Sequence, residues 1–472
     1  MVTIKRVPEE VLDEEQEQVL QRVCAIDVAK DAGQVCVRTP ATGGRRKSTI
    51  WMVEASTTAV LQLGEQLVTQ RVEMVTLEST SDYWRIFFYL LEGCGLPVQL
   101  VNARDVKNVP GRAKSDKIDA VWLAKLTERG MLRASFVPPR PIRVLRDYTR
   151  TRIDLTRDRT RYYQRLEKLL EDALIKVSVV ASSLTTVSAR DMLDALIAGH
   201  RDPDLLADLA RGAMRRHRPA LVRALTGAFD DHHAELATIL LGQIDALTGQ
   251  IDHLTTRIDQ LIADLPTTGA DPDPPTSDPA TTAQHDTAQH DTAPHDTAPH
   301  GSDDATATHR GVTQRLADIP GVSLEAAQVI VAEIGLDMTR FPTPQHLVSW
   351  AHLSPRLIQS GPRRRGGKTS RGNPYLKGIL GIAAAAASRT DTFLGERYAR
   401  IVKRRGKGKA LVAVSRSILV IVWHLLTDPD ASYHDLGADY HTRHTNLQRK
   451  IHNHIRQLEA LGLHVTLTPA AA

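Results

Sequence analysis

The stretch VCAIDVAKDAGQVCVR, residues 23–38, decides how the first part of the chain folds. Residues 23–29 form a short apolar run around one acid, Asp27, and residues 34–38 form a second run after the turn-like Asp31-Ala32-Gly33. Two such runs joined by a turn predict a pair of strands. A carboxylate inside an apolar strand is costly unless a cation or a partner meets it, so Asp27 is a candidate functional residue.

Strand and helix patterns alternate along the next hundred residues. The expected elements, in order, are a helix at 56–70, a strand at 74–77, a helix at 83–91, a strand at 97–101 and a helix at 115–129. Such alternation predicts an α/β sheet domain. We assign it to residues 22–139, after an acidic extension at 1–21, and we expect residues 140–265 to be helical throughout.

Three further acids fall where such a sheet could gather them. Glu78 follows the strand at 74–77, while Asp116 and Asp119 are three residues apart near the start of a helix and project from one face. Carboxylates suit hard divalent cations, and two Mg²⁺ ions can stabilise the attacking and leaving oxygens of a phosphoryl transfer. Taken singly, the helix acids could instead complement the helix dipole, and Glu78 could be a surface residue.

The helical region ends in a heptad pattern. Its apolar positions alternate in steps of four and three, as the a and d positions of a coiled coil do: Leu240, Ile244, Leu247, Ile251, Leu254, Ile258, Leu261 and Leu265. We therefore expect a homodimer or higher homo-oligomer formed through this coiled coil. The alternative is an amphipathic helix packed on its own domain.

Residues 266–309 form a compositional break. They contain eight Asp, no Lys or Arg, and a five-residue repeat with His at 285, 290, 295 and 300. Such a segment cannot bury enough apolar surface to offset its chain entropy, so we expect a disordered linker. The regular histidines could suggest metal binding, but nothing in a low-complexity repeat fixes a ligand geometry.

Beyond the linker, residues 310–427 predict a second, mostly helical domain, and residues 428–472 add one more basic helix. The domain opens with Ile319-Pro320-Gly321 between two helical stretches. This resembles a helix-hairpin-helix, whose backbone N–H groups can hold a phosphate, although Pro-Gly turns are also common in ordinary helical bundles.

Several features bear on the compartment. Three unevenly spaced cysteines, Cys24, Cys36 and Cys94, fit neither a disulfide framework nor a four-ligand zinc site, so we expect a reducing cytosol. The acidic N-terminus lacks the apolar region of a signal peptide. The longest apolar stretch, residues 411–426, is interrupted by Arg416 and is too short to span a bilayer, so it predicts a buried helix and no membrane association.

The net charge of +5 is unevenly distributed, because residues 356–416 contain sixteen Lys and Arg against two acids. Positive side chains beside Gly-rich backbone suit the phosphates of nucleic acid, whereas a solvated surface is the usual alternative for a charge run. We assign nucleic-acid contacts to a basic loop, the helix that follows it and a second basic run: Arg363, Arg364, Arg365, Lys368, Arg371, Lys377, Lys403, Arg404 and Arg405.

The strings AIDVAK, TLESTSDYW and GRAKSDKIDAVWLAKL resemble the RuvC-like DEDD domain of the insertion-sequence 110 family of transposases, whose relatives include the Piv invertases. A Gly often follows the glutamate by three positions in that family, and here the position is Ser81. The resemblance implies an RNase H-like fold and two Mg²⁺ ions held by four carboxylates: Asp27, Glu78, Asp116 and Asp119.

The second domain resembles the same family. WAHLSPRLIQSG, residues 350–361, is similar to its Gly/Ser-rich stretch, with His352 where Gly is usual, and GNPYLKGIL, residues 372–380, is similar to its G-N-x-x-L-R segment, with Lys377 where Arg is common. From the residues alone, Ser354, Ser360 and Ser370 are equal candidates for a nucleophile. The resemblance implies that Ser360 is the one.

The family further implies a DNA transposase or site-specific recombinase of the bacterial cytoplasm and nucleoid. Such an enzyme cuts and rejoins double-stranded DNA through a covalent phosphoserine, guided by a structured non-coding RNA. Two alternatives remain: a metal-dependent nuclease of the junction-resolvase type, in which water attacks, and a non-catalytic DNA-architectural protein.

Overall fold

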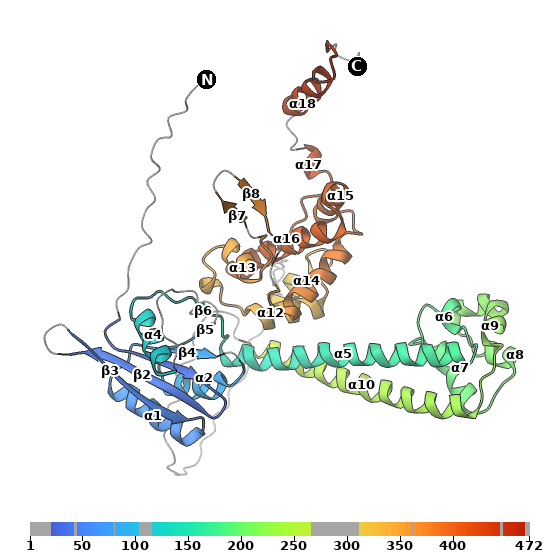
Figure 1. The fold of residues 1–472 in the computed structure, drawn as a ribbon. Helices are drawn as coiled ribbons and strands as arrows, with labels where there is room; N and C mark the ends of the chain where they lie inside the picture. The colour runs from blue at the N-terminus through green and yellow to red at the C-terminus, as the bar shows by residue number, and fades with distance from the viewer. Residues whose placement is uncertain are drawn as a thin grey trace, which may run out of the picture. The chain divides into compact units, whose positions relative to one another are not determined.

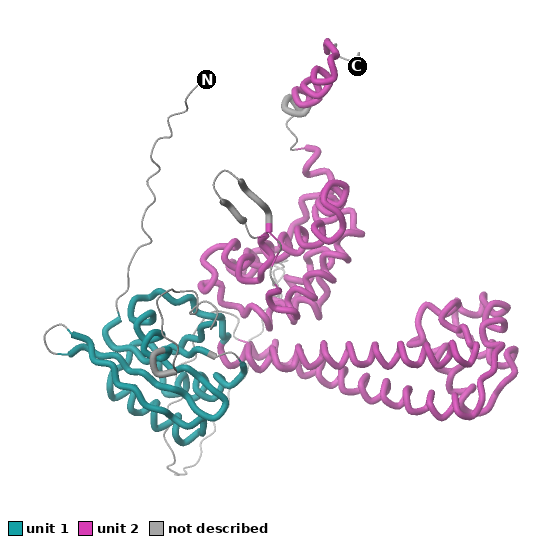
Figure 2. Tube along the Cα trace, viewed as in Figure 1, with its two compact units in different colours: residues 1–138 teal, residues 139–472 magenta. Residues whose placement is uncertain are grey.

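The computed structural model describes residues 20–41, 45–79, 81–102, 116–265, 311–355, 357–360, 363–367, 369, 371–443 and 447–467. For residues 79, 116–118, 357–360, 363–366 and 447–450 it describes the backbone alone. The predicted linker and nearly all of the predicted acidic extension lie outside these residues. The chain forms two compact units, residues 1–138 and residues 139–472 (Figure 2).

Unit 1 is built on a six-stranded mixed sheet with the order β3-β2-β1-β4-β5-β6. The three strands β1 to β3 form an antiparallel meander, β4 and β5 continue the sheet parallel to β1, and β6 is antiparallel to β5. The strands are β1 Val23–Val28, β2 Ala32–Pro40, β3 Arg46–Glu54, β4 Met74–Ser79, β5 Val98–Asn102 and β6 Ala134–Ser135. This order confirms the predicted RuvC-like, RNase H-like fold.

Helices cover both faces of this sheet (Figure 1). On one face, α1 (Thr57–Thr69) and α2 (Trp84–Gly93) pack against Cys24 and Ile26 of β1. On the other, α4 (Asp116–Glu128) packs against Val23 and Ala25 of the same strand. Because alternate residues of a strand point to opposite faces, the apolar run seen in the sequence is that of a central strand buried on both sides.

Unit 2 begins with a long antiparallel helical hairpin made of α5 (Arg140–Asp172) and α10 (Asp231–Ala263) (Figure 1). Arg152 donates to Thr255 and Arg159 donates to Thr248, which fixes the antiparallel direction. Short helices form a small core at the far end of the hairpin: α6 Val177–Val180, α7 Val187–Ile197, α8 Pro203–Asp208, η2 Gly212–His217 and α9 Arg218–Leu225.

The heptad seam of α10 is used within the chain. Ile244, Ile251 and Ile258 are buried, and α10 packs chiefly on α5. The seam therefore has a partner without a second copy, which is the alternative that the sequence left open. Self-association through this helix remains a prediction.

The rest of unit 2 is a mostly helical domain, as predicted. Its elements are α11 Val312–Ala317, α12 Leu324–Ile334, η3 Met338–Arg340, α13 Pro344–Trp350, β7 Leu357–Ser360, β8 Arg363–Gly366, α14 Pro374–Ala387, α15 Phe393–Arg405, α16 Lys407–Thr427, α17 Tyr440–Arg443 and α18 Leu447–Glu459. Among the described residues, α16 is the helix long and apolar enough to cross a membrane. It packs on α13, α14 and α15, with Val414, Ile418 and Val422 fully buried, and this packing accounts for its apolar character.

The Ile-Pro-Gly turn lies between α11 and α12 and packs on α14. Gly321 has φ +86°, and a Cβ added there would lie 2.3 Å from the carbonyl oxygen of Ala383. Only glycine fits both this backbone conformation and this close approach. Helix packing therefore requires the glycine, and the phosphate-holding role of the turn stays a prediction.

Candidate metal and nucleic-acid site

Asp27 and Glu78 stand side by side at the ends of two neighbouring strands. The parallel pairing of β1 with β4 sets Asp27 opposite Glu78 as Cα partners. Both residues lie on the face that α4 covers, because Ala25 and Thr76, two positions earlier on each strand, contact that helix or its core. Asp27 is half-buried and Glu78 is 6% exposed.

Helix α4 runs back along the sheet, so that its first turns lie toward the same strand ends. Its last residue, Glu128, accepts a hydrogen bond from the backbone N–H of Leu20, just before β1, and Thr127 donates to Thr76 of β4 at 2.8 Å. Asp119 is eight residues before Thr127 on the same helix face, about 12 Å along the axis, whereas Glu78 is about 7 Å past Thr76. Asp119 is therefore in the part of α4 that lies toward these strand ends.

Three oxygen-donor side chains from different elements, one of them buried, fit the ligand preference of a hard divalent cation. Asp27, Glu78 and Asp119 are these three residues. Their carboxylate oxygens do not all lie within 4.8 Å of one another, so the structure does not assemble them into a closed ligand group. Asp116 is the first residue of α4, and its side chain lies outside the described residues.

The loop predicted around Ser360 is a β-hairpin, which corrects the sequence-based interpretation. Ser360 is the last residue of β7 and pairs with Arg363, the first residue of β8. The side chains of Ser360 and of Arg363, Arg364 and Arg365 lie outside the described residues, as does Lys368. What the backbone shows is that the candidate nucleophile stands at the turn end of a two-stranded ribbon.

The other predicted basic residues lie on helices or just before them. Arg371 is exposed two residues before the N-cap of α14, and Lys377 is half-buried within that helix. Lys403, Arg404 and Arg405 are exposed in the last turn of α15, where positive charge also complements the helix dipole. All three of these last residues are accessible to a phosphate backbone.

In the described part of the chain, one group of side chains has ligand atoms close enough to hold a metal ion, within 4.8 Å of one another: Asp172, His232 and His233. It contains none of the predicted carboxylates. The Nδ1 of His233 lies 2.7 Å from Asp230 and its Nε2 lies 3.3 Å from Asp172. His233 is the N3 partner in the capping box of α10, so a structural role already accounts for it.

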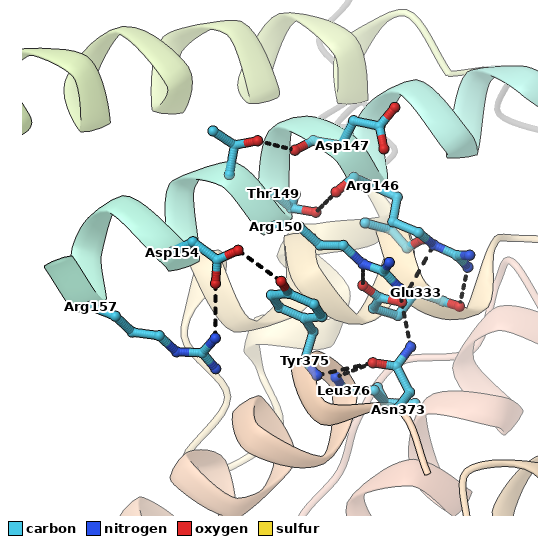
Figure 3. Close-up of polar contacts among 12 residues, drawn as sticks. Arg146, Asp147, Thr149, Arg150, Asp154, Arg157, Glu333, Asn373, Tyr375 and Leu376 are labelled. Atoms are coloured by element: carbon cyan, nitrogen blue, oxygen red, sulfur yellow. Dashed lines mark hydrogen bonds and ion pairs between the residues drawn. The ribbon is translucent and has the colours of Figure 1, made fainter. Parts of the chain in front are cut away.

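Sequence reasoning missed a buried acid in unit 2. Glu333 of α12 is fully buried and is surrounded by Arg146 and Arg150 of α5 and by Asn373, the N-cap of α14 (Figure 3). The sequence contains a signal for this residue, because Glu333 lies inside the apolar run QVIVAEIG just as Asp27 lies inside an apolar strand.

Comparisons with known proteins agree with this architecture. A family model for the DEDD domain of IS110 elements, described as a transposase, matches residues 24–175, and a second, described as the transposase IS116/IS110/IS902 family, matches residues 313–399. Together they cover about half of the chain. By class, then, this chain belongs with the transposase families. More narrowly, it belongs to the IS110 family, as the sequence predicts.

Individual relatives are more distant. A Streptomyces coelicolor protein described as the insertion element IS110 uncharacterized 43.6 kDa protein is 33% identical over 118 residues, which are 24% of this chain. The match spans 28% of that relative's own length. A Thermus thermophilus RuvC structure matches at 15% identity with a TM-score of 0.20, covering 24% of this chain and all of that one. The strand order of the sheet is what defines the fold of unit 1.

Proposed function

We propose that this chain cuts and rejoins double-stranded DNA as a transposase or site-specific recombinase. The observation that carries the proposal is the register that sets Asp27 beside Glu78 at the ends of two parallel strands. Asp119 lies in the first turn of α4. Four carboxylates hold two Mg²⁺ ions in this proposal: Asp27, Glu78, Asp116 and Asp119. When bound, such ions supply electrostatic stabilisation to the attacking and leaving oxygens of a phosphoryl transfer.

Ser360 is the proposed nucleophile. Its Oγ bonds to the scissile phosphorus as the bond from phosphorus to one flanking sugar oxygen breaks, which leaves a phosphoserine. A hydroxyl from another DNA strand then attacks that phosphorus and restores Ser360. Basic side chains such as Arg371 and Lys377 hold the phosphate in place. The reaction requires Ser360 and the carboxylates to meet, either within one chain or between two protomers of a homo-oligomer.

Trapping a covalent adduct tests the nucleophile directly. With a nicked suicide substrate and Mg²⁺, we expect an adduct from the wild type and from Ser354→Ala, the matched serine control, but none from Ser360→Ala or Asp27→Asn. An adduct formed by Ser360→Ala would show that the nucleophile is wrongly assigned. DNA cleavage without any adduct would favour the resolvase-type reaction, in which water attacks.

The proposed partners are donor and target DNA together with a structured guide RNA. Sequencing the RNA that co-purifies with the protein tests the second partner, because a guided mechanism requires one specific non-coding species. Recombination that survives both Asp27→Ala and Asp116→Ala would instead indicate a DNA-architectural protein.

A further inference from the structure

The carboxylate of Glu333 joins three helices. Its Oε1 accepts a hydrogen bond from Nε of Arg150 at 2.7 Å, and its Oε2 accepts from a terminal nitrogen of Arg150 at 2.8 Å and from Nδ2 of Asn373 at 2.5 Å. Arg146 adds an ion pair at 3.4 Å and donates to the backbone carbonyls of Ala332 and Glu333. Two guanidinium groups of α5 thus hold both the carboxylate of Glu333 and the last backbone carbonyls of α12, which fastens the end of α12 to α5 (Figure 3).

Asn373 connects α14 to the same cluster of hydrogen bonds. Its Oδ1 accepts from the backbone N–H groups of Tyr375 and Leu376, while its Nδ2 donates to Glu333. The two ends of the amide therefore have different, fixed roles. Tyr375 strengthens the junction, because its hydroxyl donates to Asp154 at 2.8 Å and the guanidinium of Arg150 lies 4.8 Å from its ring centre.

Asn373 stands at the base of the serine-bearing segment. That segment leaves the domain at His352 and returns at Gly372, and these two ends touch: a Cβ on Gly372 would lie 3.0 Å from the carbonyl oxygen of Ala351 and 3.1 Å from Cβ of His352. Gly372 has φ +62°, so glycine suits this closure. The hairpin β7–β8 thus projects from one closed base, and the next residue of the chain is bound to Glu333.

We propose that Glu333 and Asn373 are positioning residues: they hold the base of the Ser360 hairpin on α5, and so set where the nucleophile stands. This inference rests on the proposed role of Ser360. Ser360 is eight residues from His352, an arm of up to about 25 Å. A tilt of about 5° at the base moves the end of such an arm by about 2 Å, and a misplacement of about 1 Å can cost about a hundredfold in rate.

The helix that holds Glu333, and Asn373 through it, also follows directly after unit 1 in the chain. Unit 1, which carries the candidate carboxylates, ends at Pro138, and α5 begins at Arg140. Arg146 and Arg150, which bind Glu333, lie in the second and third turns of α5. The helix that leaves the carboxylate-bearing unit is thus the same helix to which the serine-bearing segment is anchored.

Asn373→Asp is the decisive variant. Aspartate caps a helix as well as asparagine does, so α14 keeps its N-cap, but the donor to Glu333 becomes a second carboxylate. We expect the single-turnover rate of adduct formation to fall by about tenfold or more, with DNA affinity changed by less than about twofold. Gln314→Glu makes the same chemical change at an exposed site of α11 and should leave both unchanged.

The double variant Glu333→Gln/Asn373→Asp provides a rescue. It returns one carboxylate and one amide to the pair with their positions exchanged, so the new amide nitrogen on α12 can donate to the new carboxylate at the N-cap of α14, and the new amide oxygen can still accept from Nε of Arg150. Because the second hydrogen bond from Arg150 loses its acceptor, we expect part of the lost rate to return. If Glu333 and Asn373 contributed only to stability, the rate of adduct formation would not fall while DNA affinity stayed the same, at a temperature where all variants are folded.

Two results would overturn the inference. One is an Asn373→Asp variant that forms adduct at the wild-type rate. The other is a loss of rate that is matched by an equal loss of DNA affinity. If the wild type forms no adduct at all, the proposed function fails. Hydrogen exchange then tests separately whether Glu333 and Asn373 hold the base of the hairpin. Faster exchange of β7 and β8 amides in Asn373→Asp, reversed in the double variant, supports it, and unchanged exchange refutes it.

Discussion

Replacing Asp27 with asparagine should make the protein more stable without metal and remove its stabilisation by Mg²⁺. Asp27 and Glu78 are partners on adjacent parallel strands, which lie about 5 Å apart. Two like charges at that distance repel by about 3 kcal/mol at an effective dielectric constant of about 20. Asp27 is only half-buried, so solvent and salt reduce the repulsion to about 1–2 kcal/mol. That is the expected gain in the free energy of unfolding of metal-free Asp27→Asn.

Magnesium should offset this difference. A cation bound at ten times its dissociation constant adds about 1.4 kcal/mol to the native state. The wild type should gain this amount and Asp27→Asn should gain little, because it has lost a ligand. Hydrogen exchange of the β1 and β4 amides, measured against denaturant with and without Mg²⁺, reports on this sheet separately from unit 2.

The matched control is Asp31→Asn, which makes the same change in charge at an exposed turn position. It should alter neither the metal-free stability nor the response to Mg²⁺ by more than about 0.5 kcal/mol. If Asp27→Asn were destabilised without metal, or stabilised by Mg²⁺ as much as the wild type, the two carboxylates would not form a metal site.

Four further predictions concern other parts of the chain. Gly321→Ala should lower the free energy of unfolding by about 2–4 kcal/mol, because the new Cβ meets Ala383 at a positive φ, whereas Gly381→Ala, with open space around its Cβ position, should be neutral or slightly stabilising; chemical denaturation measures both. Ile251→Ala should cost about 2–4 kcal/mol by the same measurement, since Ile251 is 8% exposed, and the 56% exposed Ile239→Ala should cost less than about 0.5. Burial raises the pKa of Cys36 to about 11, so the thiolate is scarce at pH 8, and mass spectrometry after alkylation should find the half-buried Cys94 modified well before Cys36. Replacing Lys403, Arg404 and Arg405 with alanine should reduce the slope of log affinity for DNA against log salt by about 3, and an unchanged slope would remove these residues from the interface.

Local patterns were enough to identify most elements of the first domain and the acids on them. Asp27 stood out because an apolar strand surrounds it, and Glu78 because it ends another. The edge strand β3 was missed because its first half is polar and most of its residues are exposed, so that the short apolar run at residues 50–53 did not stand out as a strand. The hairpin β7–β8 was missed because its charged, glycine-rich sequence is typical of a loop, and only pairing between its two halves makes it a ribbon.

The sequence by itself determined which residues prefer strand or helix, which acids are anomalous in apolar surroundings, and to which family the chain belongs. Only the tertiary structure decided which partners those residues meet. Hydrogen bonding between β1 and β4 sets Asp27 beside Glu78, and α5 rather than a second copy covers the seam of α10. The same held for Glu333, whose donors come from α5 and from the N-cap of α14. The physical reason is that a side chain's preference for burial or for a cation is a local property, whereas the identity of its partner depends on pairing between segments far apart in the chain.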